Sequence, residues 1–416
     1  MLNLGVVVTF NNVSDEDFVL LAGVPPHLIS SEKIDSSIFS VDAILFVDRL
    51  SKKFLQVDKK IFPEIFTLGF EFRQAGIRRL RDRNTDLNDP NTILKPRGMI
   101  FHVPPTNVET VFVYTLVYGV LSGSSNVVRI SDRTGTVTEK LVEIISDTLL
   151  EPELADIASR VSVIRCDRDS QVLQTIALRS DLRVWWGGDQ AVTALKKFES
   201  KPRTSDISFP DRWSVAVIDA GIFNGLDDED SRNLLRNLSN DIYLFDQLAC
   251  SSPQAIYWKS IDNDEFCRAV VKFDRLLIEA VYEMGYEIPF TNFIDKALKV
   301  AGDVLTSPGE VNWLGKELVS TSINDQVQNH KSQSGGALYH VEIDELQDLS
   351  NHVDSRVQTI VCFGIEKVEM KNALHEMKLS GIDRVVGPGK ALSFGPIWDG
   401  IDLIASFTRK IDLSQF

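Results

Sequence analysis

The stretch Phe245-Asp-Gln-Leu-Ala-Cys-Ser-Ser-Pro-Gln-Ala-Ile-Tyr-Trp258 places one cysteine, Cys250, in a short polar turn. An amphipathic helical pattern precedes this turn, and an apolar, strand-like run follows it. A thiol at such a junction can point into a cleft while rigid elements hold it on both sides. Most free cysteines, however, are small buried hydrophobic residues. The stretch by itself therefore leaves both interpretations of Cys250 open.

Residues 99–130 follow the order strand, helix, strand. Met99–Val103 is mostly apolar and strand-like, and Asn126–Ile130 is the next such run. Between them, Thr106–Glu109 matches a capping box, in which Thr and Glu side chains satisfy the first amides of a helix. The helix predicted over Val108–Leu121 is apolar nearly all round, which predicts a buried position. Such a unit is typical of parallel α/β sheets.

The alternation of strands and helices continues along the chain. Arg183–Trp186 is strand-like and runs into Gly187-Gly188, and a helix is predicted to begin near Asp189. This order lets a backbone approach a phosphate or a flat ring, but a plain tight turn has the same pattern. Ser214–Asp219 and Thr359–Phe363 are further strand-like runs. Neither GxGxxG nor GxxxxGK[ST] occurs, so the common nucleotide fingerprints give no support.

Composition narrows the class of protein. The 416 residues suggest two or three domains at roughly 150 residues per domain. A net charge of −15 argues against nucleic acid as the main partner. The cysteines and histidines are scattered, with no CxxC and no HExxH, so neither a metal site nor a disulfide is expected. The remaining cysteines have apolar neighbours and are expected in the core; they are Cys166, Cys267 and Cys362.

Two features bear on localisation. Met1–Phe10 has no basic segment and does not read as a signal peptide. The longest mostly apolar run, Val111–Leu121, is too short to span a bilayer, which takes about 20 residues. The expectation is a cytoplasmic protein with no membrane span.

These pieces together resemble the LuxC-type acyl-CoA reductases. That family is the reductase component of bacterial fatty acid reductase complexes and a branch of the aldehyde dehydrogenase superfamily. The matching segments are Pro105–Val108, Gly123–Ser131, Asp246–Pro253, Gln358-Thr359 and Arg384–Gly400. They span most of the chain, and their order and spacing match the family.

The resemblance implies an α/β fold like that of aldehyde dehydrogenases. We expect a Rossmann-like NADP(H)-binding domain over residues 1–209 and a catalytic domain with the cysteine nucleophile over 210–390. The C-terminal segment, 391–416, is expected to provide a strand that pairs with another subunit of a homo-oligomer. That last expectation rests on analogy with the fold alone.

The resemblance also implies roles for single residues. Cys250 stands at the position of the acyl-accepting cysteine, and Asn107 at that of the side-chain amide of the oxyanion hole. Arg129, Ser131 and Asp132 stand where the superfamily holds the adenosine ribose, and Gly187-Gly188 matches the turn beside the nicotinamide. Without the resemblance, Asn107 is an ordinary helix-start residue, Arg129 a solvated charge and the glycine pair a tight turn. Asp399 receives no role.

The choice between NADPH and NADH depends on the basic residues near the end of the strand predicted over Asn126–Ile130. Arg129 replaces the usual lysine, and Arg133 lies close by. Two arginines suit a 2′-phosphate, which favours NADPH. The carboxylate of Asp132 would repel that phosphate, so NADH is the alternative.

One departure from the superfamily concerns its glutamate base. Enzymes that oxidise aldehydes have this glutamate in an ELGGK-like stretch, and the corresponding stretch here is Ser208–Arg212, with serine in its place. The site would then lack the group that activates water to hydrolyse a thioester. This substitution fits reduction of a thioester.

The activity implied is NADPH-dependent reduction of an acyl-CoA, or of an acyl-protein thioester, to the aldehyde through an acyl-cysteine. The implied partner is an acyl-protein synthetase or acyltransferase. One alternative is a non-catalytic scaffold or binding subunit of an acyl-transfer complex. Another is an aldehyde-oxidising or acyl-phosphate-reducing relative of the same fold.

Overall fold

The computed structural model describes residues 17–29, 37–84, 91–306, 310–322, 335–378 and 381–415. The expectation about Met1–Phe10 therefore lies outside the described residues. The chain forms two compact units: unit 1 comprises Met1–Pro210 with Phe394–Phe416, and unit 2 comprises Asp211–Ser393.

Unit 1 contains a six-stranded sheet in the order β1-β5-β4-β3-β6-β7. Neighbouring strands pair in parallel except β1, which is antiparallel to β5. The strands are β1 (Val19–Gly23), β3 (Met99–Val103), β4 (Ser125–Ile130), β5 (Val161–Arg165), β6 (Leu182–Trp186) and β7 (Ser205–Phe209). The parallel α/β sheet predicted from the sequence is confirmed.

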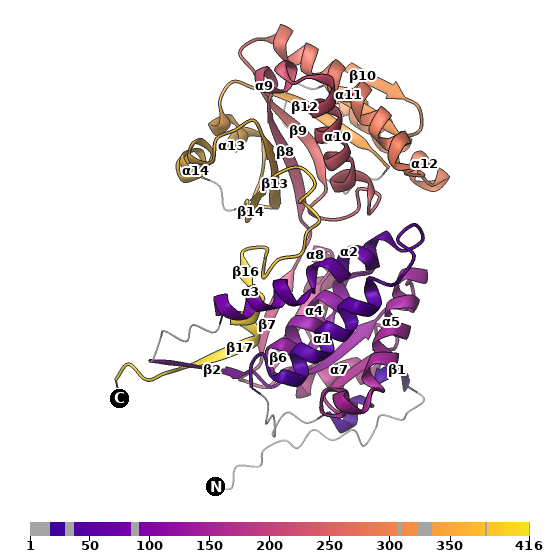
Figure 1. Ribbon diagram of the computed structural model, residues 1–416, viewed down its shortest axis with the longest axis vertical. Coiled ribbons are helices and arrows are strands. Elements are labelled where there is room, and N and C mark those ends of the chain that lie inside the picture. Colours follow the sequence, from indigo (N-terminus) through magenta and orange to yellow (C-terminus); the bar gives the residue numbers. More distant parts are fainter. Residues whose placement is uncertain are drawn as a thin grey trace. The chain divides into compact units, whose positions relative to one another are not determined.

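Helices cover both faces of this sheet. Successive side chains of β3 point to opposite faces, and each face packs against a different set of helices. Phe101 packs with residues of α7 (Gln171–Arg179) and α8 (Asp189–Leu195). On the other face, the ring of His102 lies 2.7 Å from the hydroxyl of Thr115 on α4 (Val111–Leu121). Figure 1 shows this layered arrangement of the unit. The other helices of unit 1 are α1 (Val41–Phe54), α2 (Pro63–Glu71), α3 (Gln74–Asn84), α5 (Thr136–Leu149), α6 (Ala155–Ala158), α15 (Leu403–Phe407), η2 (Pro26–Leu28) and η3 (Pro152–Leu154).

Every residue of α4 is buried, as its apolar sequence predicts. The capping box predicted at Thr106–Glu109 is wrong: the N-cap residue is Thr110, and its side chain makes no capping hydrogen bond. Glu109 instead accepts hydrogen bonds from the amides of Gly135 (3.1 Å) and Thr138 (2.7 Å) at the start of α5. The carboxylate of Glu109, which the local sequence pattern assigned to α4, thus caps α5.

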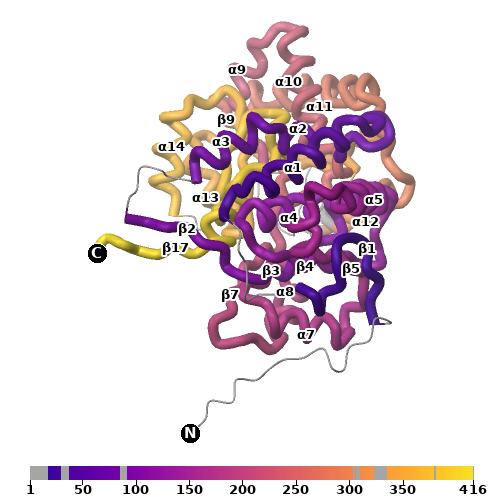
Figure 2. Tube along the Cα trace, turned by 60° about the horizontal axis from the view of Figure 1, so that its bottom comes forward, coloured from indigo at the N-terminus to yellow at the C-terminus, as the bar shows by residue number. Residues whose placement is uncertain are grey.

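Within the C-terminal segment 391–416, which was expected to provide a strand, the strand-like run Ile404–Leu413 divides into two elements. It begins within α15 (Leu403–Phe407), and β17 (Thr408–Asp412) follows. β17 pairs antiparallel with β2 (Thr92–Pro96), as Figures 1 and 2 show. β15 (Ile397–Trp398) and β16 (Ile401–Asp402) form a small antiparallel pair of their own.

Unit 2 contains a seven-stranded sheet in the order β10-β11-β12-β9-β8-β13-β14. Only β10 and β11 pair antiparallel; the other neighbours are parallel. The strands are β8 (Trp213–Asp219), β9 (Pro253–Lys259), β10 (Glu310–Leu314), β11 (Leu318–Ser322), β12 (Ala337–Ile343), β13 (Val357–Phe363) and β14 (Arg384–Val386). The helices are α9 (Ala220–Gly225), α10 (Asp228–Tyr243), α11 (Asn263–Met284), α12 (Phe290–Thr306), α13 (Leu349–His352), α14 (Lys367–Glu376) and η4 (Leu346–Asp348).

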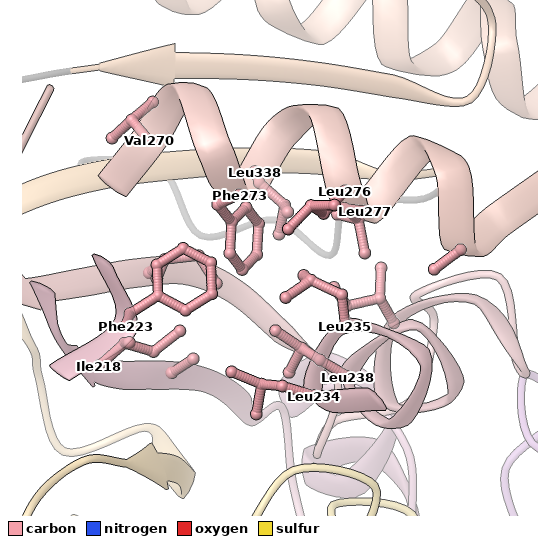
Figure 3. Packing of buried hydrophobic residues seen from close by; sticks show 14 of the residues in the cluster. Ile218, Phe223, Leu234, Leu235, Leu238, Val270, Phe273, Leu276, Leu277 and Leu338 are labelled. Atoms are coloured by element: carbon pink, nitrogen blue, oxygen red, sulfur yellow. The ribbon is translucent and has the colours of Figure 1, made fainter. Parts of the chain in front are cut away.

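The larger core of unit 2 lies between its sheet and helices α10 and α11. In Figure 3, Leu235 and Leu238 of α10 point toward Phe273 and Leu277 of α11. The amphipathic face predicted for α10 is therefore confirmed. Cys267, expected in the core, is exposed, since it lies one step round α11 from the buried Phe266.

Candidate active site

The strand order of unit 1 reverses between β3 and β6. β4 and β5 lie on one side of β3, whereas β6 and β7 lie on the other. In such sheets the crevice outside the carboxyl ends of the strands, at this switch point, is where ligands bind. Asn107 lies in the loop after β3, and Gly187-Gly188 follows β6. Both predicted segments thus follow the two strands that flank the switch point.

Gly187 has backbone torsion φ = 143°, a conformation that favours glycine. A Cβ there would lie 3.6 Å from the Cβ of Ala191, in ordinary contact, so the torsion angle rather than crowding requires glycine. Gly188 then takes the N-cap position of α8. The result is a side-chain-free approach to a helix start, as a dinucleotide needs.

Aromatic rings surround the residue before this turn. The ring of Trp186 stacks on Phe209 with centroids 3.8 Å apart, and Trp398 lies 6.3 Å from Trp186. The indole Nε1 of Trp186 and the hydroxyl of Ser208 are both buried without a hydrogen-bond partner. Buried polar atoms usually have partners, so this end of β6 and β7 offers groups to a ligand. Ser208 is the residue predicted at the glutamate position.

The three predicted ribose-binding residues lie at the end of β4 and just beyond it. Arg129 is buried, and its guanidinium donates to the carbonyl of Cys166 at 2.8 and 3.1 Å. The hydroxyl of Ser131 accepts from the amide of Arg133 at 3.3 Å. Asp132 is exposed and lies 3.8 Å from the guanidinium of Arg165. Arg129 is therefore a structural residue in part, and Arg165 is a cation beside the predicted Asp132 that sequence reasoning missed.

Cys250 lies in the turn between α10 and β9, at the amino ends of the parallel strands of unit 2. It is half-buried. The amide of Gln358 donates to its sulfur at 3.4 Å, and the hydroxyl of Ser214 donates to its carbonyl at 2.7 Å. Ser214 is the second residue of β8 and Gln358 the second residue of β13, the two strands where the order of this sheet reverses.

The turn before Cys250 contains two residues with left-handed backbone torsions. Asp246 has φ = 57° and Gln247 has φ = 63°, an uncommon pair for residues other than glycine. The amide of Gln247 donates to the carbonyls of Pro253 (3.0 Å) and Ala337 (2.8 Å). Its oxygen accepts from the amides of Gly336 and Ala337. Four hydrogen bonds from one buried side chain thus stabilise the strained turn.

A buried lysine supports the same region from α12. Lys296 donates to the carbonyls of Lys316 (2.6 Å) and Gly335 (2.5 Å), and the amide of Gly335 donates to the carbonyl of Asp246. Burial lowers the pKa of Lys296 to about 8. The neutral amine of Lys296 therefore forms at a lower pH than that of an exposed lysine. Its two carbonyl partners are acceptors and favour the charged ammonium.

The Gly387-Pro-Gly389 stretch is a turn, and its amides face a carboxylate of the chain itself. Asp241 of α10 accepts from the amides of Gly389 (2.6 Å) and Ala391 (2.9 Å). Burial raises the pKa of Asp241 to about 6. This turn is thus fastened to α10.

Sequence reasoning gave no role to the residues that hold Cys250. Gln247 and Gln358 both lie within the segments that resemble the family. A glutamine is neither a nucleophile nor an acid or base, so its presence in a sequence does not by itself indicate a functional role. A polar side chain at the start of an apolar strand, as in Ser214 and Gln358, was the available signal, because buried polar groups need partners.

The comparisons with known proteins bear on this arrangement. Residues 76–280 match the model of the acyl-CoA reductase (LuxC) family. Over this half of its length the chain is similar to the LuxC family. The long-chain acyl-protein thioester reductase of Aliivibrio fischeri is 22% identical over 302 residues, which cover 71% of this chain and 59% of the relative. That of Photorhabdus laumondii is 20% identical over 324 residues, covering 76% and 63%. The chain thus spans only about six-tenths of the length of these two curated relatives.

Solved structures agree on the fold. The lactaldehyde dehydrogenase of Escherichia coli superposes with a TM-score of 0.64 at 12% identity, covering 95% of this chain and 94% of that one. The glyceraldehyde-3-phosphate dehydrogenase of Methanocaldococcus jannaschii, complexed with NADP, gives 0.63 at 10% identity, covering 89% and 88%. The fold of this chain is therefore that of aldehyde dehydrogenases.

No cluster of three or more His, Cys, Asp or Glu residues in the part of the chain that the structure describes could hold a metal ion. Within the same ranges, none of the helices combines the length and apolar character that a bilayer crossing requires.

Proposed function

We propose that this protein reduces an acyl thioester to the aldehyde through a covalent acyl-Cys250 intermediate, with NADPH as hydride donor. The observation that supports this most is the environment of Cys250. Its sulfur accepts an amide hydrogen bond at 3.4 Å in a half-buried turn that two strands of unit 2 hold in place.

The first step is acyl transfer. The thiolate of Cys250 attacks the carbonyl carbon of the thioester, and the bond to the sulfur of coenzyme A, or of a carrier protein, breaks. Coenzyme A leaves as a thiolate and takes a proton from solvent. The resemblance to the family gives the side chain of Asn107 and the backbone amide of Cys250 the role of stabilising the negative charge on the carbonyl oxygen. One such donor contributes about 2.7–4 kcal/mol to the transition state.

The second step is reduction. NADPH, when bound, supplies the hydride that the acyl carbon accepts. The bond between that carbon and the Cys250 sulfur then breaks, which releases the aldehyde and regenerates the thiolate. A thiolate is both a good nucleophile and a good leaving group. The cysteine therefore suits both the arrival of the acyl group and the departure of the aldehyde. A serine at position 208 leaves the site without a carboxylate there to activate water, which favours reduction over hydrolysis.

The residues of unit 1 fit a dinucleotide. The open approach at Gly187, the helix start at Gly188 and the buried, unpaired indole Nε1 of Trp186 lie at the end of β6 beside the switch point. Asp132 and Arg165 lie near the position expected for the ribose. On this basis we propose unit 1 as the cofactor domain and unit 2 as the catalytic domain.

The acyl donor is either an acyl-CoA or an acyl-protein thioester, and the names of the two curated relatives favour the second. The test is NADPH oxidation measured against a panel of acyl-CoA chain lengths and against an acylated carrier protein. Wild type should oxidise NADPH with at least one donor, and Cys250→Ala should not. NADPH oxidation that persists in Cys250→Ala, or none with any donor, would overturn the proposal.

A further inference from the structure

Gln358 is connected to Cys250 by direct contact as well as through the backbone. It is 3% exposed on β13, and its side-chain amide nitrogen lies 3.4 Å from the Cys250 sulfur. A buried primary amide is a hydrogen-bond donor at every pH at which the protein is folded, because it neither gains nor loses a proton. The sulfur therefore has a permanent donor beside it.

The orientation of this amide is consistent with its neighbours. The hydroxyl of the buried Thr359 lies 3.2 Å from the Gln358 oxygen and can donate to it. With the oxygen turned toward that hydroxyl, the amide nitrogen faces the sulfur. A thiol is a weak donor, whereas a thiolate is a full acceptor. The amide nitrogen is thus a better partner for the thiolate than for the thiol.

The same strand also fixes the backbone of Cys250. The amide of Thr359 donates to the hydroxyl of Ser214 at 3.1 Å, and that hydroxyl donates to the Cys250 carbonyl at 2.7 Å. Adjacent residues of β13 therefore act on the carbonyl and on the sulfur of one cysteine. One hydrogen bond holds the Cys250 carbonyl and another holds its sulfur, and together they restrict the direction in which the sulfur points.

We infer that Gln358 is a positioning residue that aims the Cys250 sulfur and stabilises its thiolate through the amide hydrogen bond. The inference deepens the proposed function and rests on it for its catalytic meaning. It assigns the activation of the nucleophile to a neutral donor. Such a donor helps the thiolate to form before acyl transfer and again when the aldehyde leaves, and it cannot deprotonate water.

The test measures the alkylation of Cys250 by iodoacetamide as a function of pH, with each cysteine peptide quantified separately by mass spectrometry. Only the thiolate reacts, so the pH midpoint of alkylation reports its stability. Gln358→Met removes the donor at similar size, and its midpoint should rise by about half a unit to one unit. Gln358→Glu places a carboxylate beside the sulfur, and its midpoint should rise further, by about one to two units.

Two controls separate this effect from general damage. Cys267 is exposed on α11, so its midpoint in the same samples should stay at the wild-type value. Gln171 is exposed at the start of α7, and Gln171→Glu should leave the Cys250 midpoint unchanged. If Gln358→Glu fails to fold, Gln358→Met decides the matter alone.

The experiment uses no acyl donor and no cofactor, so it is independent of the proposed reaction. A Cys250 midpoint in Gln358→Met within 0.2 units of wild type, with Cys267 unchanged, would overturn the inference even if the enzyme reduces thioesters. Conversely, a raised midpoint in a protein that accepts no acyl group would uphold the role of Gln358 and reject the proposed function.

Discussion

The side-chain amide of Gln247 donates a hydrogen bond of 2.8 Å to the carbonyl of Ala337, the first residue of β12. Gln247 lies in the left-handed turn three residues before Cys250, and Ala337 lies 90 residues further along the chain. The position of the proposed nucleophile thus depends on a strand that is remote in sequence. Local pattern alone cannot predict such a dependence.

Gln247→Ala should destabilise unit 2 by about 3 kcal/mol, because it leaves several buried backbone groups without a partner. It should also reduce acylation of Cys250 more than the loss of stability explains, since the strained turn is no longer held. Urea unfolding and the acylation rate of the folded fraction are the two measurements. The matched control is Gln171→Ala on the surface, expected within about 0.5 kcal/mol of wild type. Equal stability of the two variants would contradict the role given to Gln247.

Asp241 should make stability depend on pH. Its pKa is raised from 3.8 to about 6, chiefly by burial, so the folded protein retains a proton that the unfolded chain has lost. The resulting stabilisation is fully present below about pH 3.8 and is lost as the pH rises through about 6. Asp241→Asn lacks this titration. The stability of wild type relative to Asp241→Asn should therefore fall by roughly 2–3 kcal/mol between pH 3.8 and pH 7.

Urea unfolding of both proteins at several pH values across this window measures that difference. Loss of one hydrogen bond in Asp241→Asn adds a constant offset, so only the slope with pH is informative. A difference that is flat with pH would show that the amides of Gly389 and Ala391 balance burial, and one that rises with pH would show that they outweigh it.

Glu109 should stabilise the start of α5 rather than of α4. Glu109→Ala removes the acceptor for two amides and the Thr138 hydroxyl, which should cost about 1–2 kcal/mol. Glu109→Gln keeps an acceptor oxygen and should cost less. Thermal unfolding compares both with Glu153→Ala, an exposed residue of η3 that should be neutral. A neutral Glu109→Ala would mean that solvent replaces these bonds without loss.

Asp132 should limit the preference for NADPH. Removing its charge in Asp132→Asn takes away repulsion of a 2′-phosphate, while Arg165 keeps its ion pair with Glu139. The ratio of kcat/KM for NADPH to that for NADH should rise on the order of tenfold. Asp156→Asn, a charge change on the exposed part of α6, is the control. A shift toward NADH would place the 2′-position elsewhere.

The sequence was informative about the elements and the order of the sheets because buried strands and amphipathic helices follow period and polarity. It predicted β3, α4 and β4 to within a few residues, and the glycine pair after β6. It failed where a residue serves a distant partner: Glu109 caps a later helix, and the run from Ile404 divides between α15 and β17 because Thr408–Asp412 pairs with β2.

The candidate site shows the same division. Motif resemblance identified Cys250, Asn107 and the ribose-binding positions, all of which remain proposals. The residues that fix Cys250 were not predicted, since Ser214, Gln247 and Gln358 act through contacts between strands that only the folded chain brings together. Arg129 also combines a predicted charge with a buried bond to the Cys166 carbonyl that its sequence context does not suggest.

The most direct measurement is the fate of the acyl group on the protein. Purified wild type is incubated with radiolabelled long-chain acyl-CoA, or with the acylated carrier protein, and the labelled peptide is mapped before and after NADPH is added. The account predicts label on the Cys250 peptide that NADPH releases as aldehyde, and no label in Cys250→Ala. Label that persists in Cys250→Ala, or that leaves as free acid, would contradict it.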